Sequence, residues 1–121
     1  ACRAAAAAIA PLANVITPFP GGATRSGSKV GSKYSGLFAS TNEAYCPTLR
    51  GIVAQPLDAE VKAILEIVID GMSFDAISLA MRTGITAACE SVGVDGLVGV
   101  TAGNYGGKLG RHHFHLAEVM Q

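Results

Sequence analysis

The chain has 121 residues, which is about the size of one domain and too short for two ordinary hydrophobic cores. Half of its residues are hydrophobic and 15% are charged, a balance that excludes intrinsic disorder. Nine Lys and Arg offset nine Asp and Glu, so the net charge of zero argues against binding to nucleic acid or to anionic lipid.

Other global features concern the membrane, the redox compartment and the start of the chain. The longest apolar runs, residues 4–10 and 64–69, are shorter than the roughly 20 residues that cross a bilayer. The three cysteines lack CxxC spacing, which argues against a disulfide framework and against a zinc site. We therefore expect a soluble, cytoplasmic protein. The chain begins without Met and inside an uncapped Ala-rich helix, so we expect a truncated sequence, with a signal peptide as the alternative.

The first half of the chain predicts one helix followed by mostly irregular structure. An Ala-rich helix is expected over residues 1–15, and Pro11 should kink or end it. Residues 16–36 contain two Pro, five Gly and four Ser, a composition typical of a loop with at most short extended pieces. A short strand is expected over residues 37–40, followed by a polar connection through residues 41–50.

A strand and a second helix are expected next. Residues 61–69 are rich in Val and Ile and end at the turn dipeptide Asp70-Gly71, which predicts a strand. Ser73 is expected to cap a helix over residues 74–89, because apolar residues recur there at three- and four-residue steps. Small residues keep one flank of this helix thin enough for close packing on a sheet: Ala80, Gly84, Ala87 and Ala88.

The last part of the chain completes the predicted architecture. Strands are expected over residues 97–102 and 111–116, separated by residues 103–110, which contain four glycines. The order helix, strand, strand, helix, strand, strand is a split βαβ pattern that lacks its opening strand. It predicts an α+β, ferredoxin-like sandwich with two helices on one face of a mostly antiparallel sheet.

Glu66 is a candidate for chemistry because it is a carboxylate within an apolar strand. Strand alternation places it on one face with Ile64 and Val68. Burial disfavours the charged form of a carboxyl group, and a carboxyl group that stays neutral near pH 7 can give and take protons. Glu66 is therefore a candidate general acid or base. The alternative is a position at the rim of the sheet, in water or paired with Lys or Arg.

Two segments could bind an anionic ligand. Residues 25–33 combine flexible backbone donors, hydroxyls and cations, which suit carboxylate or phosphate groups, but they do not fit the GxxxxGK[ST] pattern of nucleotide hydrolases. Residues 103–110 could let a substrate approach the main chain closely. The alternatives are a solvated loop and a tight connection between strands. The candidate binding residues are Arg25, Ser26, Ser28, Lys29, Lys33, Asn104, Tyr105 and Lys108.

The histidines and one cysteine suggest other chemistry that the pattern does not support. Alternation places only His113 and His115 on one face, and no Cys or acidic residue joins them at ligand spacing before Glu118. We therefore expect surface histidines and no metal. Nothing near Cys46 marks its thiolate as an activated nucleophile, so we expect a small buried residue there.

Three segments together resemble one enzyme family. They are ITPFPGGATRSGSKVGSKYSGLFASTNEAYCPTLRG (16–51), LEIVIDG (65–71) and TAGNYGGKLGRHHFHL (101–116), and their long strings are far more specific than a single glycine motif. The chain resembles formylmethanofuran:tetrahydromethanopterin formyltransferase, including the related subunit of the formyltransferase/hydrolase complex of methylotrophs. Members of this family have two similar lobes, so the resemblance implies that residues 1–121 are the C-terminal lobe, without the N-terminal lobe.

The resemblance also implies a reaction and its participants. A formyl group is transferred between N-formylmethanofuran and N5 of tetrahydromethanopterin, in the one-carbon metabolism of methanogenesis and methylotrophy. The two carriers bind as substrates, and no metal or prosthetic group is needed. Family members are cytoplasmic homo-oligomers, commonly tetramers, or subunits of the formyltransferase/hydrolase complex.

The resemblance places Glu66, within LEIVIDG, at the position of the proposed catalytic carboxylate of the family. The segments 25–33 and 104–108 would then position the two carriers. An isolated lobe would lack part of the cleft, so its own activity is in doubt. A carrier-binding or assembly subunit without catalytic activity is the alternative.

Overall fold

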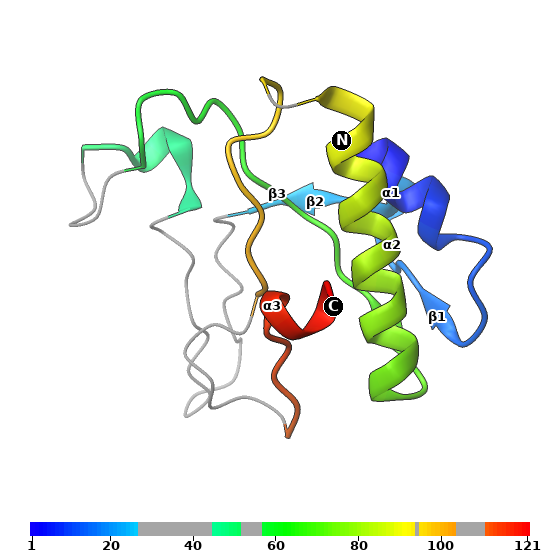
Figure 1. Cartoon of the computed structure of the whole chain (residues 1–121). Coiled ribbons are helices and arrows are strands. Elements are labelled where there is room, and N and C mark those ends of the chain that lie inside the picture. The colour runs from blue at the N-terminus through cyan, green and yellow to red at the C-terminus, as the bar shows by residue number, and fades with distance from the viewer. Residues whose placement is uncertain (27–44, 52–56, 94, 104–110) are drawn as a thin grey trace. The chain divides into compact units, whose positions relative to one another are not determined.

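The computed structural model describes residues 1–26, 45–51, 57–93, 95–103 and 111–121. The chain divides into two compact units. Unit 1 comprises Ala1–Ala23 and Ile67–Gln121, and unit 2 comprises Thr24–Glu66. The described residues form an α+β structure with antiparallel strand pairs and two main helices, as the sequence predicted at this level (Figure 1).

Two helices form the centre of unit 1. Helix α1 spans Cys2–Ile9, so it ends shortly before Pro11, as expected because proline cannot continue a helix. Helix α2 spans Phe74–Val92, slightly longer than predicted. Its N-cap is Ser73, whose Oγ accepts a hydrogen bond from the Ala76 backbone N–H at 3.2 Å, which confirms the predicted cap.

Small residues allow α1 and α2 to pack closely. Ala5 and Ile9 of α1 are each 2% exposed, and Ala80 of α2 is fully buried. A Cβ atom added to Gly84 would lie 2.7 Å from Ile9 Cδ1, so any larger residue would displace the isoleucine side chain. The thin flank of the second helix therefore packs against α1, where the sequence led us to expect a sheet (Figure 1).

The strand predicted over residues 61–69 is divided between two separate pairings. Strand β3, Leu65–Glu66, pairs antiparallel with β2, Thr24–Arg25, in unit 2. Strand β4, Asp70–Gly71, pairs antiparallel with β1, Val15–Ile16, in unit 1. The prediction of one continuous strand is wrong because the backbone changes its hydrogen-bonding partner between residues 66 and 70.

The two strands predicted near the C-terminus are not formed. Residues 97–102 have no regular secondary structure, and residues 111–115 lead into helix α3, Leu116–Val119, which packs on α2 (Figure 1). The Nε of Arg82 on α2 donates a hydrogen bond to the Val119 carbonyl oxygen at 2.8 Å. A strand requires a paired neighbour, which side-chain alternation alone does not supply. The strand expected over residues 37–40 lies outside the described residues.

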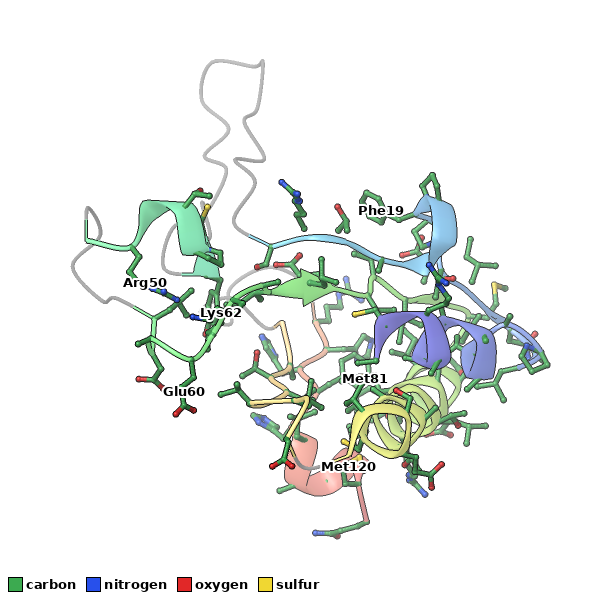
Figure 2. All side chains as sticks on the ribbon, turned by 90° about the horizontal axis from the view of Figure 1, so that it is seen from above. Phe19, Arg50, Glu60, Lys62, Met81 and Met120 are labelled. Carbon is green, nitrogen blue, oxygen red and sulfur yellow. The ribbon has the colours of Figure 1, made fainter. Side chains whose placement is uncertain are left out.

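Short 3-10 turns complete the described structure. They span Pro20–Gly22 in unit 1 and Pro47–Leu49 in unit 2. After the second turn, the Arg50 guanidinium donates hydrogen bonds to the carbonyl oxygens of Asp58 and Val61, and Figure 2 shows Arg50 beside the turn that carries Lys62. Within the described part of the chain, none of the helices has the length and hydropathy that crossing a bilayer would require.

Candidate active site

Glu66 is positioned by the ladder between β2 and β3. Thr24 lies directly opposite Glu66, and the Ser26 backbone N–H donates to the Ile64 carbonyl oxygen at 3.0 Å, which extends the pairing by one residue. Opposite residues on antiparallel strands share a face, and side chains alternate along each strand. Thr24, Ser26, Ile64 and Glu66 therefore share one face of the ladder.

The side chains of Ser26 and Glu66 are directly hydrogen-bonded. The Ser26 Oγ donates to Glu66 Oε1 at 2.5 Å, although the two residues are 40 positions apart in the sequence. Ser26 is 7% exposed and is the single buried polar residue in the described ranges. Glu66 is half-buried. The ladder thus brings together two of the predicted site residues and gives the carboxylate a fixed donor.

The exposures of Leu65 and Glu66 are inverted relative to their polarity. Leu65 is 49% exposed, whereas the neighbouring carboxylate is half-buried. Both placements cost free energy, because an apolar side chain stays in water and a polar one loses part of its hydration. Arg25 lies opposite Leu65, so the register places it on the other face of the ladder from Glu66.

The remaining predicted binding residues cannot be placed. Ser28, Lys29, Lys33, Asn104, Tyr105 and Lys108 lie outside the described residues. Their grouping around Glu66 therefore stays a prediction from the sequence.

A second cluster lies in unit 1, around the start of α2. The ring of Phe74 stacks on Phe114, with centroids 4.5 Å apart and an interplanar angle of 10°, and its centroid lies 5.8 Å from that of His112. The sequence placed His112 and Phe114 on one face, and both contact the same ring. Sequence reasoning missed this cluster, because the first residue of a helix carries no local signal for a stacking partner 40 positions away.

A small pocket adjoins this aromatic cluster. Its volume is about 70 Å³, far below the 300–1,000 Å³ typical of ligand sites, so it is too small for a large carrier. The Ser78 Oγ and the His113 Nε2 are buried and have no hydrogen-bond partner among the described residues. The pocket is lined by Phe74, Ser78, Arg82, His115, Glu118 and Val119.

The histidines and Cys46 have ordinary surroundings. His112 and His115 are exposed, as expected, whereas His113 is half-buried. Cys46 is also half-buried, and its Sγ lies 3.0 Å from the Thr48 Oγ1. In the part of the chain that was searched, no group of three or more His, Cys, Asp or Glu is arranged to hold a metal ion.

Comparison with known proteins identifies the class of this chain. The family model described as "FTR, proximal lobe" matches residues 1–119. The chain belongs to this family, as its resemblance to formylmethanofuran:tetrahydromethanopterin formyltransferase predicted.

Individual relatives define the class further. A protein from Rhodopirellula baltica named formylmethanofuran–tetrahydromethanopterin formyltransferase is 62% identical over 120 residues, which are 99% of this chain and 36% of the relative. One subunit of the formyltransferase/hydrolase complex of Methylorubrum extorquens is 52% identical over 110 residues, covering 91% of this chain and 35% of the relative. The crystal structure of that complex with methylofuran matches with a TM-score of 0.83 and 50% identity, over 98% of this chain and 39% of the matched chain. The chain thus spans little more than a third of the length of these relatives.

Proposed function

We propose that the protein containing this chain, called the complete protein below, transfers a formyl group between N-formylmethanofuran and N5 of tetrahydromethanopterin. The observation that carries this proposal is the 62% identity, over 99% of this chain, to a relative named for that activity. We further propose that residues 1–121 form its C-terminal lobe. The family model described as a proximal lobe and the partial coverage of each relative support this assignment.

The reaction exchanges one C–N bond for another. N5 of tetrahydromethanopterin attacks the formyl carbon of N-formylmethanofuran, and the carbonyl oxygen becomes an oxyanion in a tetrahedral intermediate. The bond from this carbon to the methanofuran nitrogen then breaks. The proton lost by N5 is balanced by the proton gained by the departing amine. The reverse reaction passes through the same intermediate.

Glu66 is the proposed catalytic residue. As a neutral acid, its carboxyl group would stabilise the oxyanion by donating a hydrogen bond, and it could pass a proton to the departing amine. Its half-buried position and the hydrogen bond from Ser26 support this role, because they hold the carboxyl group in one orientation, and an oriented group needs no rearrangement during the reaction. This chemistry requires no metal or prosthetic group.

The carriers and the assembly belong to the same proposal. We propose that Arg25, together with the segments around Lys29 and Tyr105, positions the two carriers, because these segments combine cations with flexible backbone donors. We also propose a cytoplasmic homotetramer or a subunit of a formyltransferase/hydrolase complex, without nucleic-acid or membrane partners. The net charge of zero supports the absence of nucleic-acid and membrane partners.

The finer architecture is likewise proposed for the complete protein. It is a ferredoxin-like α+β sandwich with two helices on one face of a mostly antiparallel sheet. The TM-score of 0.83 to the Methylorubrum extorquens complex is consistent with a shared lobe fold.

Glu66→Gln in the complete protein tests the proposed function. We expect kcat for formyl transfer to fall about 100-fold or more, because general acid catalysis typically contributes at least that much. The midpoint of thermal unfolding should stay at or above that of the wild type, because the amide oxygen still accepts from Ser26 and no charge is buried. Formyl transfer between the two carriers is followed by absorbance.

Glu60→Gln is the matched control, because Glu60 is an exposed acid in the same unit (Figure 2). It should leave kcat unchanged. A fully active Glu66→Gln variant would show that the carboxylate is structural. A wild-type protein that binds the carriers without transferring the formyl group would instead support a carrier-binding subunit.

A further inference from the structure

We propose that Ser26 is a positioning residue that acts through Glu66 and does not contact the carriers itself. Its hydroxyl holds Glu66 Oε1, so that the acid proton resides on the other carboxyl oxygen, Oε2. This inference rests on the proposed function, in which Glu66 supplies the acid. It replaces the expectation from the sequence that Ser26 binds a carrier directly.

The geometry of the ladder fixes the serine hydroxyl. The backbone of Ser26 is held by its hydrogen bond to Ile64, and the adjoining pair Thr24–Glu66 fixes the spacing between the strands. The serine side chain has one torsion that places its oxygen, and at 7% exposure it has little room to turn. The Oγ therefore stays on the face that carries Glu66.

Hydrogen counting then distinguishes the two carboxyl oxygens. A serine hydroxyl has one hydrogen, and that of Ser26 is donated to Glu66 Oε1. It is consequently not available for donation to a substrate. A neutral carboxylic acid also has one hydrogen. Its carbonyl oxygen is the better acceptor, so the hydrogen bond from Ser26 to Oε1 favours the form that carries this hydrogen on Oε2.

The consequence for catalysis is orientation of the acid. With Oε1 held, the carboxyl group cannot rotate freely about its terminal torsion, and Oε2 keeps one direction. Loss of such positioning typically costs far more in turnover than in substrate binding, because a misplacement of about 1 Å can cost about 100-fold in rate. Removal of a residue that contacted the carrier in the ground state would instead raise KM more than it lowers kcat.

The test compares Ser26→Ala, Ser26→Cys and Ser26→Thr in the complete protein. For Ser26→Ala, we expect kcat to fall roughly 10- to 100-fold, with KM for both carriers within about twofold of wild type. Ser26→Thr keeps the hydroxyl and should restore most of the turnover. Ser26→Cys keeps the side-chain size with a weaker donor, so its kcat should lie between those of the Ala variant and the wild type. It replaces Ser26→Ala if thermal unfolding shows that variant to be poorly folded.

A double-mutant cycle with Glu66→Gln isolates the pair. If Ser26 acts through the carboxyl group, adding Ser26→Ala to Glu66→Gln should lower kcat by less than about twofold. Thr24→Val is the matched control, because Thr24 is the neighbouring residue on the same face of β2 and valine keeps its branched shape while removing its hydroxyl. It should leave kcat unchanged.

The outcomes separate this inference from the function on which it rests. A wild-type protein without formyl transfer overturns both. An active wild type whose Ser26→Ala variant has unchanged kcat, or raised KM with normal kcat, overturns the positioning role alone. So does a Ser26→Ala effect of full size in the Glu66→Gln background.

Discussion

Lys29 belongs to the segment that we propose to bind the carriers, and it has no proposed role in the chemical step. It stands in a segment with Arg25 and Lys33 and no acidic residue, a composition suited to anionic groups on a long carrier. Hydrogen bonds to charged groups contribute about 1.5–3 kcal/mol, which corresponds to a tenfold or greater change in affinity. We expect Lys29→Ala to raise KM for one carrier by about tenfold. Steady-state kinetics over a range of carrier concentrations would measure this.

The control for this prediction is Lys62→Ala. Lys62 is exposed, and its Nζ donates to the Ala59 carbonyl oxygen at 3.3 Å, so the variant removes a cation of unit 2 outside the predicted binding segments. Its KM values should equal those of the wild type. An unchanged KM in Lys29→Ala as well would remove residues 25–33 from the binding site.

At the scale of elements, the packing of α1 on α2 depends on the absence of a side chain at Gly84. A valine there would place atoms within the volume occupied by Ile9, which is 2% exposed and cannot move into solvent without loss of burial. Overpacking of this kind typically costs about 1–3 kcal/mol. We expect Gly84→Val to lower the free energy of unfolding by that amount in urea titrations, whereas Gly99→Val, where the added Cβ meets open space, should have little effect.

The N-terminus of α2 supports a second prediction at this scale. Ser73 accepts from the Ala76 N–H, one of the donors that a helix cannot satisfy internally. Removal of such a cap costs about 1 kcal/mol. Ser73→Ala should therefore lower the free energy of unfolding by that amount. Ser91→Ala serves as the control, because Ser91 Oγ only donates to the Ala88 carbonyl oxygen near the other end of the helix. Equal effects from both substitutions would contradict the capping role.

Helices could be predicted from the sequence because their signals are local. Pro11 and Ser73 mark boundaries that lie within a few residues of the hydrogen bonds they affect. Strands depend on partners elsewhere in the chain. The apolar pattern over residues 61–69 could not show that its two ends pair with different strands, and the pattern over residues 111–116 is equally typical of an extended segment that leads into a helix.

The candidate site divides in the same way. Glu66 stood out as a single acid in an apolar run, and Ser26 stood out within a polar segment. The hydrogen bond between them could not be predicted, because it depends on the register of β2 against β3. Once that register is known, side-chain alternation places Arg25 on the opposite face of the ladder from Glu66.

At the scale of the whole molecule, this chain accounts for only 36% of the length of its Rhodopirellula baltica relative. Large substrates supply binding energy through contacts far from the reacting atoms, and loss of these contacts lowers turnover as well as affinity. We therefore expect residues 1–121 alone to show a kcat/KM at least about 100-fold below that of the complete protein. Circular dichroism of the isolated chain should still show α1 and α2. If the isolated chain and the complete protein had comparable kcat/KM values, the proposal that the cleft needs further parts of the protein would be contradicted.

The distance along the chain between Ser26 and Glu66 has an evolutionary consequence. Closing a longer loop costs only about 0.6 kcal/mol for each doubling of its length, so related sequences can gain or lose residues between these positions at little thermodynamic cost. A slip of one residue in the β2–β3 pairing is different, since it would turn Ser26 to the opposite side of the sheet from Glu66. Outside the proposed carrier-binding segment 25–33, insertions and deletions between the two strands thus cost little stability, whereas a change in the register of β2 against β3 would separate Ser26 from Glu66.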